Sequence, residues 1–138
     1  SALSNCWRKA GKAMLKKFVE FVSKCPILSN AQINVNYLDS MPGSVSVEPQ
    51  GEAEIVKQYI SGERLLRRVF KIALRGESSR RKDINMQYAQ RMEELAQWLC
   101  TNTLEMCDIS VISMPEAEYS ASLATRISLT AEVIYAEA

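Results

Sequence analysis

The sequence predicts an α+β domain in which a mainly antiparallel sheet of about five to six strands carries two helices packed on one face. Two segments repeat apolar residues at three- and four-residue steps, which is the pattern of an amphipathic helix. Other segments alternate apolar with polar residues, as strands with one buried face do. Because the predicted order is helix, several strands with a long hairpin, helix and two strands, we expect mainly antiparallel pairing.

Length and composition indicate one domain, predicted to span residues 1–138. Hydrophobic residues make up 47% of the chain and charged residues 24%, close to the averages of soluble globular proteins. No internal repeat or linker divides the sequence. No apolar run approaches the ~20 residues of a membrane span, so we expect a soluble protein that is made in the cytosol and has no membrane partner.

The first helix is predicted over residues 6–25. Its apolar face is followed by Pro26, which ends the helix because proline has no amide hydrogen to donate. Its other face is basic. The second helix is predicted from about Lys82 to Thr101, where Ile84, Tyr88 and Met92 begin a run at helical spacing.

The strands are predicted from alternation and from turn residues. Two short strands, at residues 33–37 and 44–47, precede a break at residues 49–52. A further strand over residues 55–60 ends in a tight turn at Ser61-Gly62 and pairs antiparallel with a long strand over residues 64–75. Arg68 interrupts the apolar face of that long strand, so we expect a bulge or an exposed first part there. Two closing strands, around residues 109–113 and 127–135, are separated by a break at residues 115–118.

The residue types present argue against catalysis. The chain has no histidine, so it lacks the commonest general base and the Ser-His and Cys-His nucleophile systems. Its five glycines form no phosphate-binding loop, and its four cysteines show no metal-ligand spacing. We therefore expect no enzymatic activity, no cofactor and no metal.

One cationic segment stands out as the candidate site. Eight of the 17 basic residues fall on the long strand and the loop after it, although the net charge is only +1. Exposed charges that protect a sheet edge would explain them, as would a subunit interface or a surface facing DNA. We favour the interface, because few aromatic residues are available for base stacking. The candidate ring or tube contacts are Arg64, Arg67, Arg68, Lys71, Arg75, Arg80, Arg81 and Lys82.

Four segments follow one another in a distinctive order. They are a Cys-Pro that closes the first helix, a strand, a Ser-Val-Ser-Val-Glu-Pro strand and the segment Ile-Val-Lys-Gln-Tyr-Ile-Ser-Gly, at residues 25–28, 33–38, 44–49 and 55–62. Together with residues 64–78, the helix at 88–99 and the closing Ile134-Tyr135, they resemble the minor capsid or tail-completion proteins of phages of Gram-positive bacteria. The resemblance covers nearly the whole chain, and its specificity lies in order and spacing.

The resemblance implies a fold similar to the tail terminator of long-tailed phages, in which six copies form a ring that caps the tail tube. Such a ring ends tube polymerisation and then provides the surface for head-to-tail joining. The implied partners are other copies of the chain in a hexameric ring, the tail tube protein and the head connector or neck protein, with DNA passing through the ring. The implied location is the head-proximal end of the tail, in a virion or a tail-like particle assembled in the bacterial cytoplasm.

Other functions stay open at this point. A head-side completion or neck protein would bind the portal or adaptor and not the tube. A small enzyme or ligand-binding α+β domain would need a site that the residues do not reveal. A nucleic-acid-binding module would rest on the basic segment alone. For the tail terminator, the long hairpin from about residue 56 to residue 75 is the candidate contact.

Overall fold

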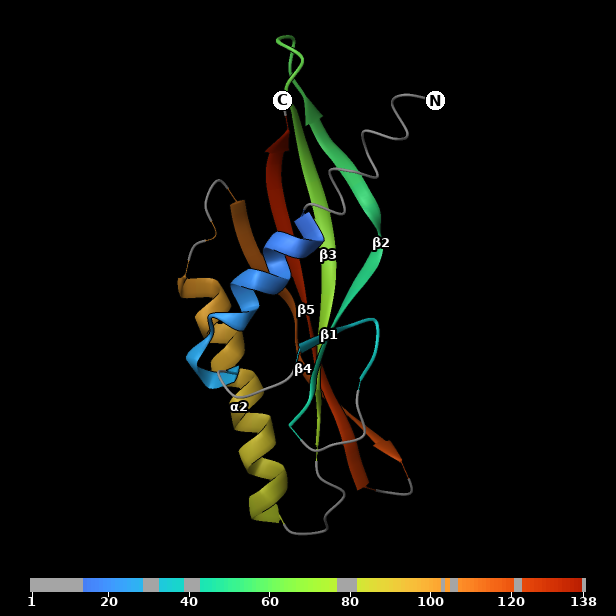
Figure 1. Cartoon of the computed structure of the whole chain (residues 1–138), viewed down its shortest axis with the longest axis vertical. Helices are drawn as coiled ribbons and strands as arrows, with labels where there is room; N and C mark the ends of the chain where they lie inside the picture. The colour runs from blue at the N-terminus through green and yellow to red at the C-terminus, as the bar shows by residue number, and fades with distance from the viewer. Residues whose placement is uncertain are drawn as a thin grey trace.

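The computed structural model describes residues 14–28, 33–38, 43–76, 82–102, 104, 107–120 and 123–137. A helix over residues 14–23 and the short 3-10 helix η1 (Pro26–Leu28) come first. They are followed by β1 (Ile33–Val35), β2 (Val45–Gln58), β3 (Arg64–Arg75), α2 (Lys82–Thr101), β4 (Cys107–Ser120) and β5 (Leu123–Glu137). One five-stranded sheet with two helices on one face confirms the α+β class (Figure 1).

The sheet is mixed, so the prediction of a mainly antiparallel sheet is wrong. The strand order is β1-β2-β3-β5-β4, and β1 runs parallel to β2 while the other neighbours are antiparallel. A hairpin would need only two to five connecting residues. Here β1 ends at Val35 and β2 begins at Val45, so the two parallel strands are separated by more residues than a hairpin turn has. Asn36 and Gly43, near the two ends of the connection between these strands, both have positive φ angles, of 58° and 89°.

The break predicted at residues 49–52 is also wrong, because β2 runs through it as one strand. Its register against β3 shifts between Gln50 and Glu54, and Gly51 has a φ of 75° there. Pro49 is tolerated because β1 pairs only with Val45 to Val47. Among the described residues, β2 therefore has no neighbouring strand at Pro49 except β3. The irregularity that the sequence indicates is therefore a bulge and not a chain break.

The break predicted at residues 115–118 fails for the same reason. β4 continues through Pro115 to Ser120 and shifts its register against β5 between Val111 and Ser113 and again before Glu116. β4 is the last strand in the sheet order and, within the described part of the chain, pairs only with β5. Some of its amide groups therefore have no strand to bond to, and a proline, which has no amide hydrogen, is tolerated there. The closing hairpin is thus longer than predicted.

Two elements have the predicted bounds. β3 covers Arg64–Arg75 and α2 covers Lys82–Thr101. The first helix ends before Pro26 as expected, and its predicted beginning, residues 6–13, lies outside the described residues. β3 pairs with β5 without any register shift, but its register against β2 shifts at Arg68, which lies between Val69 and Arg67, the partners of Gln50 and Glu54. The irregularity expected at Arg68 is therefore present, with the extra residues on β2.

The core lies between the sheet and the two helices. Phe18 of the first helix stacks on Phe70 of β3, with ring centroids 4.4 Å apart and ring planes at 12°. Phe21 contacts Trp98, which joins the first helix to α2, and α2 packs against β4 and β5. Phe70 therefore marks the buried face of β3. The neighbouring residues of β3 point to the opposite face, which we call the outer face.

Candidate assembly surface

The predicted cationic site does not form one surface. Because side chains alternate along a strand, Arg64 and Arg68 lie on the buried face of β3 with Phe70. The other three cations of β3, Arg67, Lys71 and Arg75, lie on the outer face. Arg80 and Arg81 lie outside the described residues. Lys82 begins α2, and its side chain is likewise outside the described part.

The two arginines on the buried face contribute to packing and not to an exposed patch. Arg64 donates a hydrogen bond to Glu137 at 3.0 Å, across the β3–β5 pair. The guanidinium of Arg68 lies 5.8 Å from the centroid of the Phe70 ring, and its Nε is buried without a hydrogen-bond partner. Burial raises the pKa of the neighbouring Tyr135 hydroxyl, which also has no partner, although the charge of Arg68 opposes this shift. The stem of Arg68 thus serves as part of the core.

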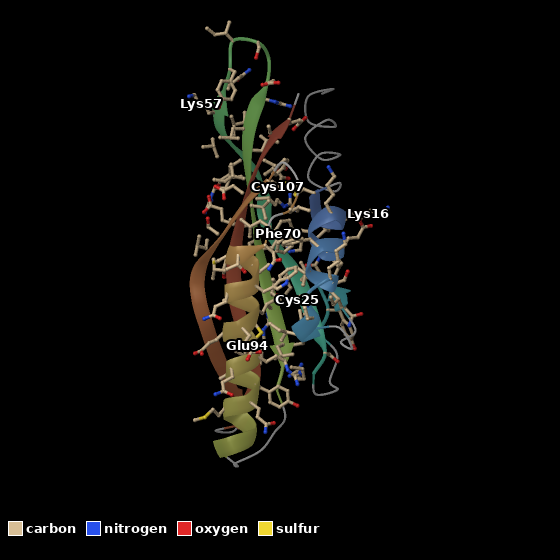
Figure 2. The ribbon with its side chains drawn as sticks, turned by 90° about the vertical axis from the view of Figure 1, so that its left-hand side faces the viewer. Lys16, Cys25, Lys57, Phe70, Glu94 and Cys107 are labelled. Carbon is tan, nitrogen blue, oxygen red and sulfur yellow. The ribbon has the colours of Figure 1, made fainter. Side chains whose placement is uncertain are left out.

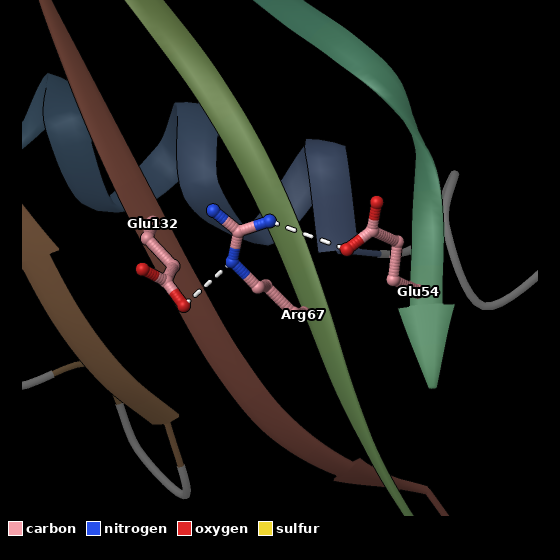
Figure 3. Close-up of polar contacts among 3 residues, drawn as sticks. All are labelled: Glu54, Arg67 and Glu132. Carbon is pink, nitrogen blue, oxygen red and sulfur yellow. Dashed lines mark hydrogen bonds and ion pairs between the residues drawn. The ribbon is translucent and has the colours of Figure 1, made fainter. Parts of the chain in front are cut away.

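On the outer face, Arg67 is held between two carboxylates. Its Nε donates to Glu132 of β5 at 2.7 Å, and its NH1 nitrogen donates to Glu54 of β2 at 3.3 Å (Figure 3). Figure 3 also shows the first helix behind the strands, which places this contact opposite the helices. The pKa of the Arg67 guanidinium is raised, most of all by the hydrogen bond with Glu132. The negative charge of Glu132 and the contact with Glu54 raise this pKa further, whereas desolvation opposes the shift.

A second ion pair crosses the same face. Arg126 of β5 donates to Glu48 of β2 at 2.7 Å, although β3 lies between these strands. Glu48 is in register with Lys71 and Arg126 with Arg75, so the pair crosses β3 at the small, buried Ala73. Lys71 and Arg75 also interact with other groups. Arg67 and Arg126 are therefore paired with carboxylates within the chain, which weakens the case for phosphate binding by these two cations.

We expect the two carboxylates that hold Arg67 to differ in their effect on stability. Glu132→Gln should lower the melting temperature more than Glu54→Gln, because the Glu132 contact is shorter and its side chain is 19% exposed, against 70% for Glu54. Thermal unfolding at low and high salt would measure this. Equal effects of the two substitutions would mean that Arg67 is not held as described.

Among the described residues, four of the eight exposed large apolar side chains belong to the β2–β3 hairpin, on the last part of β2 and in the turn that follows it. This hairpin projects beyond the helices and beyond the end of β5 (Figure 1), and Lys57 marks its projecting end in Figure 2. The Nζ of Lys57 lies 5.1 Å from the centroid of the Tyr59 ring, and Ile60 is fully exposed. We call these exposed apolar residues the tip patch; they are Ile55, Val56, Tyr59 and Ile60.

Backbone hydrogen bonds fix the shape of this tip. The amide of Tyr59 donates to the carbonyl of Glu63 at 2.8 Å, and Gly62 donates back to Tyr59 at 3.1 Å. Gly62 has a φ of 96°, a conformation that residues with a side chain rarely adopt. The sequence correctly indicated the hairpin, but it did not reveal the tip patch, because alternation in residues 55–60 predicts one buried face.

The cysteines provide no metal site among the described residues, which contain no group of three or more candidate ligands. Cys25, Cys100 and Cys107 are free thiols. Cys25 is buried between the first helix and η1, and Cys100 is exposed on α2. Burial raises the pKa of the Cys25 and Cys107 thiols, which keeps them protonated at neutral pH.

We expect the three thiols to react with a thiol-specific reagent in the order Cys100, Cys107, Cys25. Cys100 is exposed, Cys107 is half-buried, and Cys25 should react only when the chain unfolds. Quenching the labelling reaction at a series of times and analysing the peptides by mass spectrometry would give the labelling rate of each thiol at neutral pH. Labelling of Cys25 as fast as Cys100 would contradict the packing of the first helix on the sheet.

Comparison of the sequence with protein-family models and with curated proteins gives no match. Within the described residues, neither helix has the combination of length and apolar character needed to cross a membrane. Two features of the described surface are candidates for a function, the paired charges of the outer face and the tip patch. Of these, only the tip patch consists of groups that gain from leaving water.

Proposed function

We propose that this protein is a structural assembly protein that caps a tail tube as a ring, ends tube polymerisation and presents a surface for head-to-tail joining. The observation that carries the proposal is the projecting β2–β3 hairpin, which exposes Tyr59 and Ile60 in its turn and Ile55 and Val56 on the last part of β2. Exposed apolar groups that project in this way favour a macromolecular contact. The order of sequence segments that resembles tail-completion proteins supports the same function.

The shape of the sheet supports a ring. The hairpin belongs to β2, on one side of the strand order, whereas β4 lies on the other side. A contact that joins two different surfaces of the same molecule repeats from copy to copy, and it closes into a ring when the rotation allows. Six copies, the number that the resemblance implies, would enclose a channel through which DNA can pass.

The pairing of charges favours assembly over DNA recognition. Arg67 and Arg126 are each held by carboxylates of neighbouring strands, so binding phosphates would require breaking those contacts. The proposed role therefore needs no affinity for DNA, only room for its passage.

Deleting the gene from the parent particle tests the proposal. If the protein ends tube growth, negative-stain electron microscopy should show overlong tubes without heads, and expression of the intact chain in trans should restore normal length. Tails of normal length beside separate filled heads would assign the protein to head-side joining instead. Complete infectious particles would refute any role in tail assembly.

A further inference from the structure

We propose that the tip patch of one copy packs against the outer edge of β4 of the next copy, at Ile112. This contact rests on the proposed function, because it describes how the copies of a ring would meet. It assigns the exposed hairpin to contact between copies of this chain and not to contact with the tube. The argument uses the two edges of the sheet, their bulges and their charges.

Exposed apolar residues occur towards both edges of the sheet, in addition to others elsewhere on the surface. The tip patch belongs to the hairpin of β2 and β3, and Ile112, which is 48% exposed, lies on β4 at the far end of the strand order. Two different apolar surfaces on opposite sides of one molecule can meet in neighbouring copies without blocking further copies. A contact between two identical patches would stop at a dimer.

Both edges use a bulge to expose a β-branched residue. In β2, Ile55 pairs with Leu66 and Lys57 with Leu65, so Val56 is the extra residue. In β4, Val111 pairs with Ala131 and Ser113 with Thr130, so Ile112 is the extra residue. A bulge redirects a side chain and interrupts the regular row of backbone groups. Both edges are thus unsuited to strand addition and suited to side-chain contact.

The size and charge of the surfaces fit a repeated contact. Four side chains at a hairpin tip are few compared with the roughly 800 Å² that each partner buries in a stable two-chain complex. A closed ring gives each copy two such contacts, one through its tip and one through its β4 edge. The tip carries both signs of charge, Lys57 beside Tyr59 and the exposed Glu63. β4 carries the exposed Asp108 four residues before Ile112, so Lys57 is the tip residue that would pair with Asp108.

Thiol cross-linking tests the contact. Ile60→Cys and Ile112→Cys are introduced together in a background in which Cys6, Cys100 and Cys107 are replaced by serine, because Cys107 is only half-buried and lies on β4. A bis-maleimide is added to the concentrated purified variant and to particles assembled with that variant. Head-to-tail contact should give a ladder of covalent oligomers on denaturing gels. The matched control replaces Ile112→Cys by Val35→Cys, since Val35 is 43% exposed but lies on β1, at the other side of the sheet. This control and each single variant should give no ladder.

The outcomes separate this inference from the proposed function. No ladder in either preparation, or a ladder of equal strength with Val35→Cys, would overturn the contact while leaving the tube-length result unaffected. A dimer formed by Ile60→Cys alone would show that two tips meet each other, which also overturns it. A ladder together with normal tube lengths in the deletion strain would uphold the contact and refute the terminator role.

Discussion

Phe70→Ala is expected to lower the free energy of unfolding by about 3–5 kcal/mol, a large share of the stability of an ordinary domain. Phe70 is fully buried and stacks on Phe18, so removing its ring leaves a cavity where the first helix meets the sheet. The large loss of stability is therefore expected only if that helix packs on β3 as described. Chemical denaturation followed by circular dichroism would measure the change. Phe18→Ala should have a similar effect, and the double variant should lose less than the sum, because both substitutions remove the same contact.

The matched control for this experiment is Tyr37→Ala. Tyr37 is also aromatic but is 63% exposed, so its replacement should change stability by no more than about 0.5 kcal/mol. A loss below about 1 kcal/mol for Phe70→Ala would contradict the packing of the first helix on β3.

Ile60→Asp is expected to leave the stability of the isolated chain unchanged and to reduce the yield of complete particles by at least about tenfold. Ile60 is fully exposed, so the folded chain should tolerate a carboxylate there. In an assembled contact the same carboxylate would be buried without a partner, at a cost of several kcal/mol, and about 1.4 kcal/mol already corresponds to tenfold. Complementation of a deletion strain, scored by counting complete particles, would measure the effect.

Two variants control for this result. Ile60→Val keeps the site apolar and should assemble normally, whereas Val35→Asp introduces a carboxylate on β1, away from the tip, and should also assemble. Normal yield with Ile60→Asp would remove the tip patch from the assembly surface.

The success of the sequence in predicting β3 and its failure with β2 and β4 have one physical cause. β3 lies between two strands, so its residues must alternate and cannot include proline without losing a ladder hydrogen bond. Pro49 and Pro115 lie on strands that have a described neighbour on only one side at those positions, where a missing amide hydrogen costs little. Proline therefore gave a false break in both β2 and β4.

The candidate site was predicted less well than the fold, because charge along a strand does not reveal its partners. The sequence shows Arg67, but Glu132 follows it by 65 residues, and only the pairing of β3 with β5 brings them together. Likewise, the alternation of residues 55–60 predicts a half-buried strand, whereas the short β1 ends before this part of β2 and leaves it exposed. Both errors concern contacts between distant segments, which local patterns do not encode.

Cryo-electron microscopy of the head-proximal end of the tube in isolated particles tests the central claim most directly. A closed ring of copies of this chain at that end is the predicted result, with each β2–β3 hairpin reaching the neighbouring copy. A tube that ends without copies of the chain, or copies located only at the portal, would contradict the account.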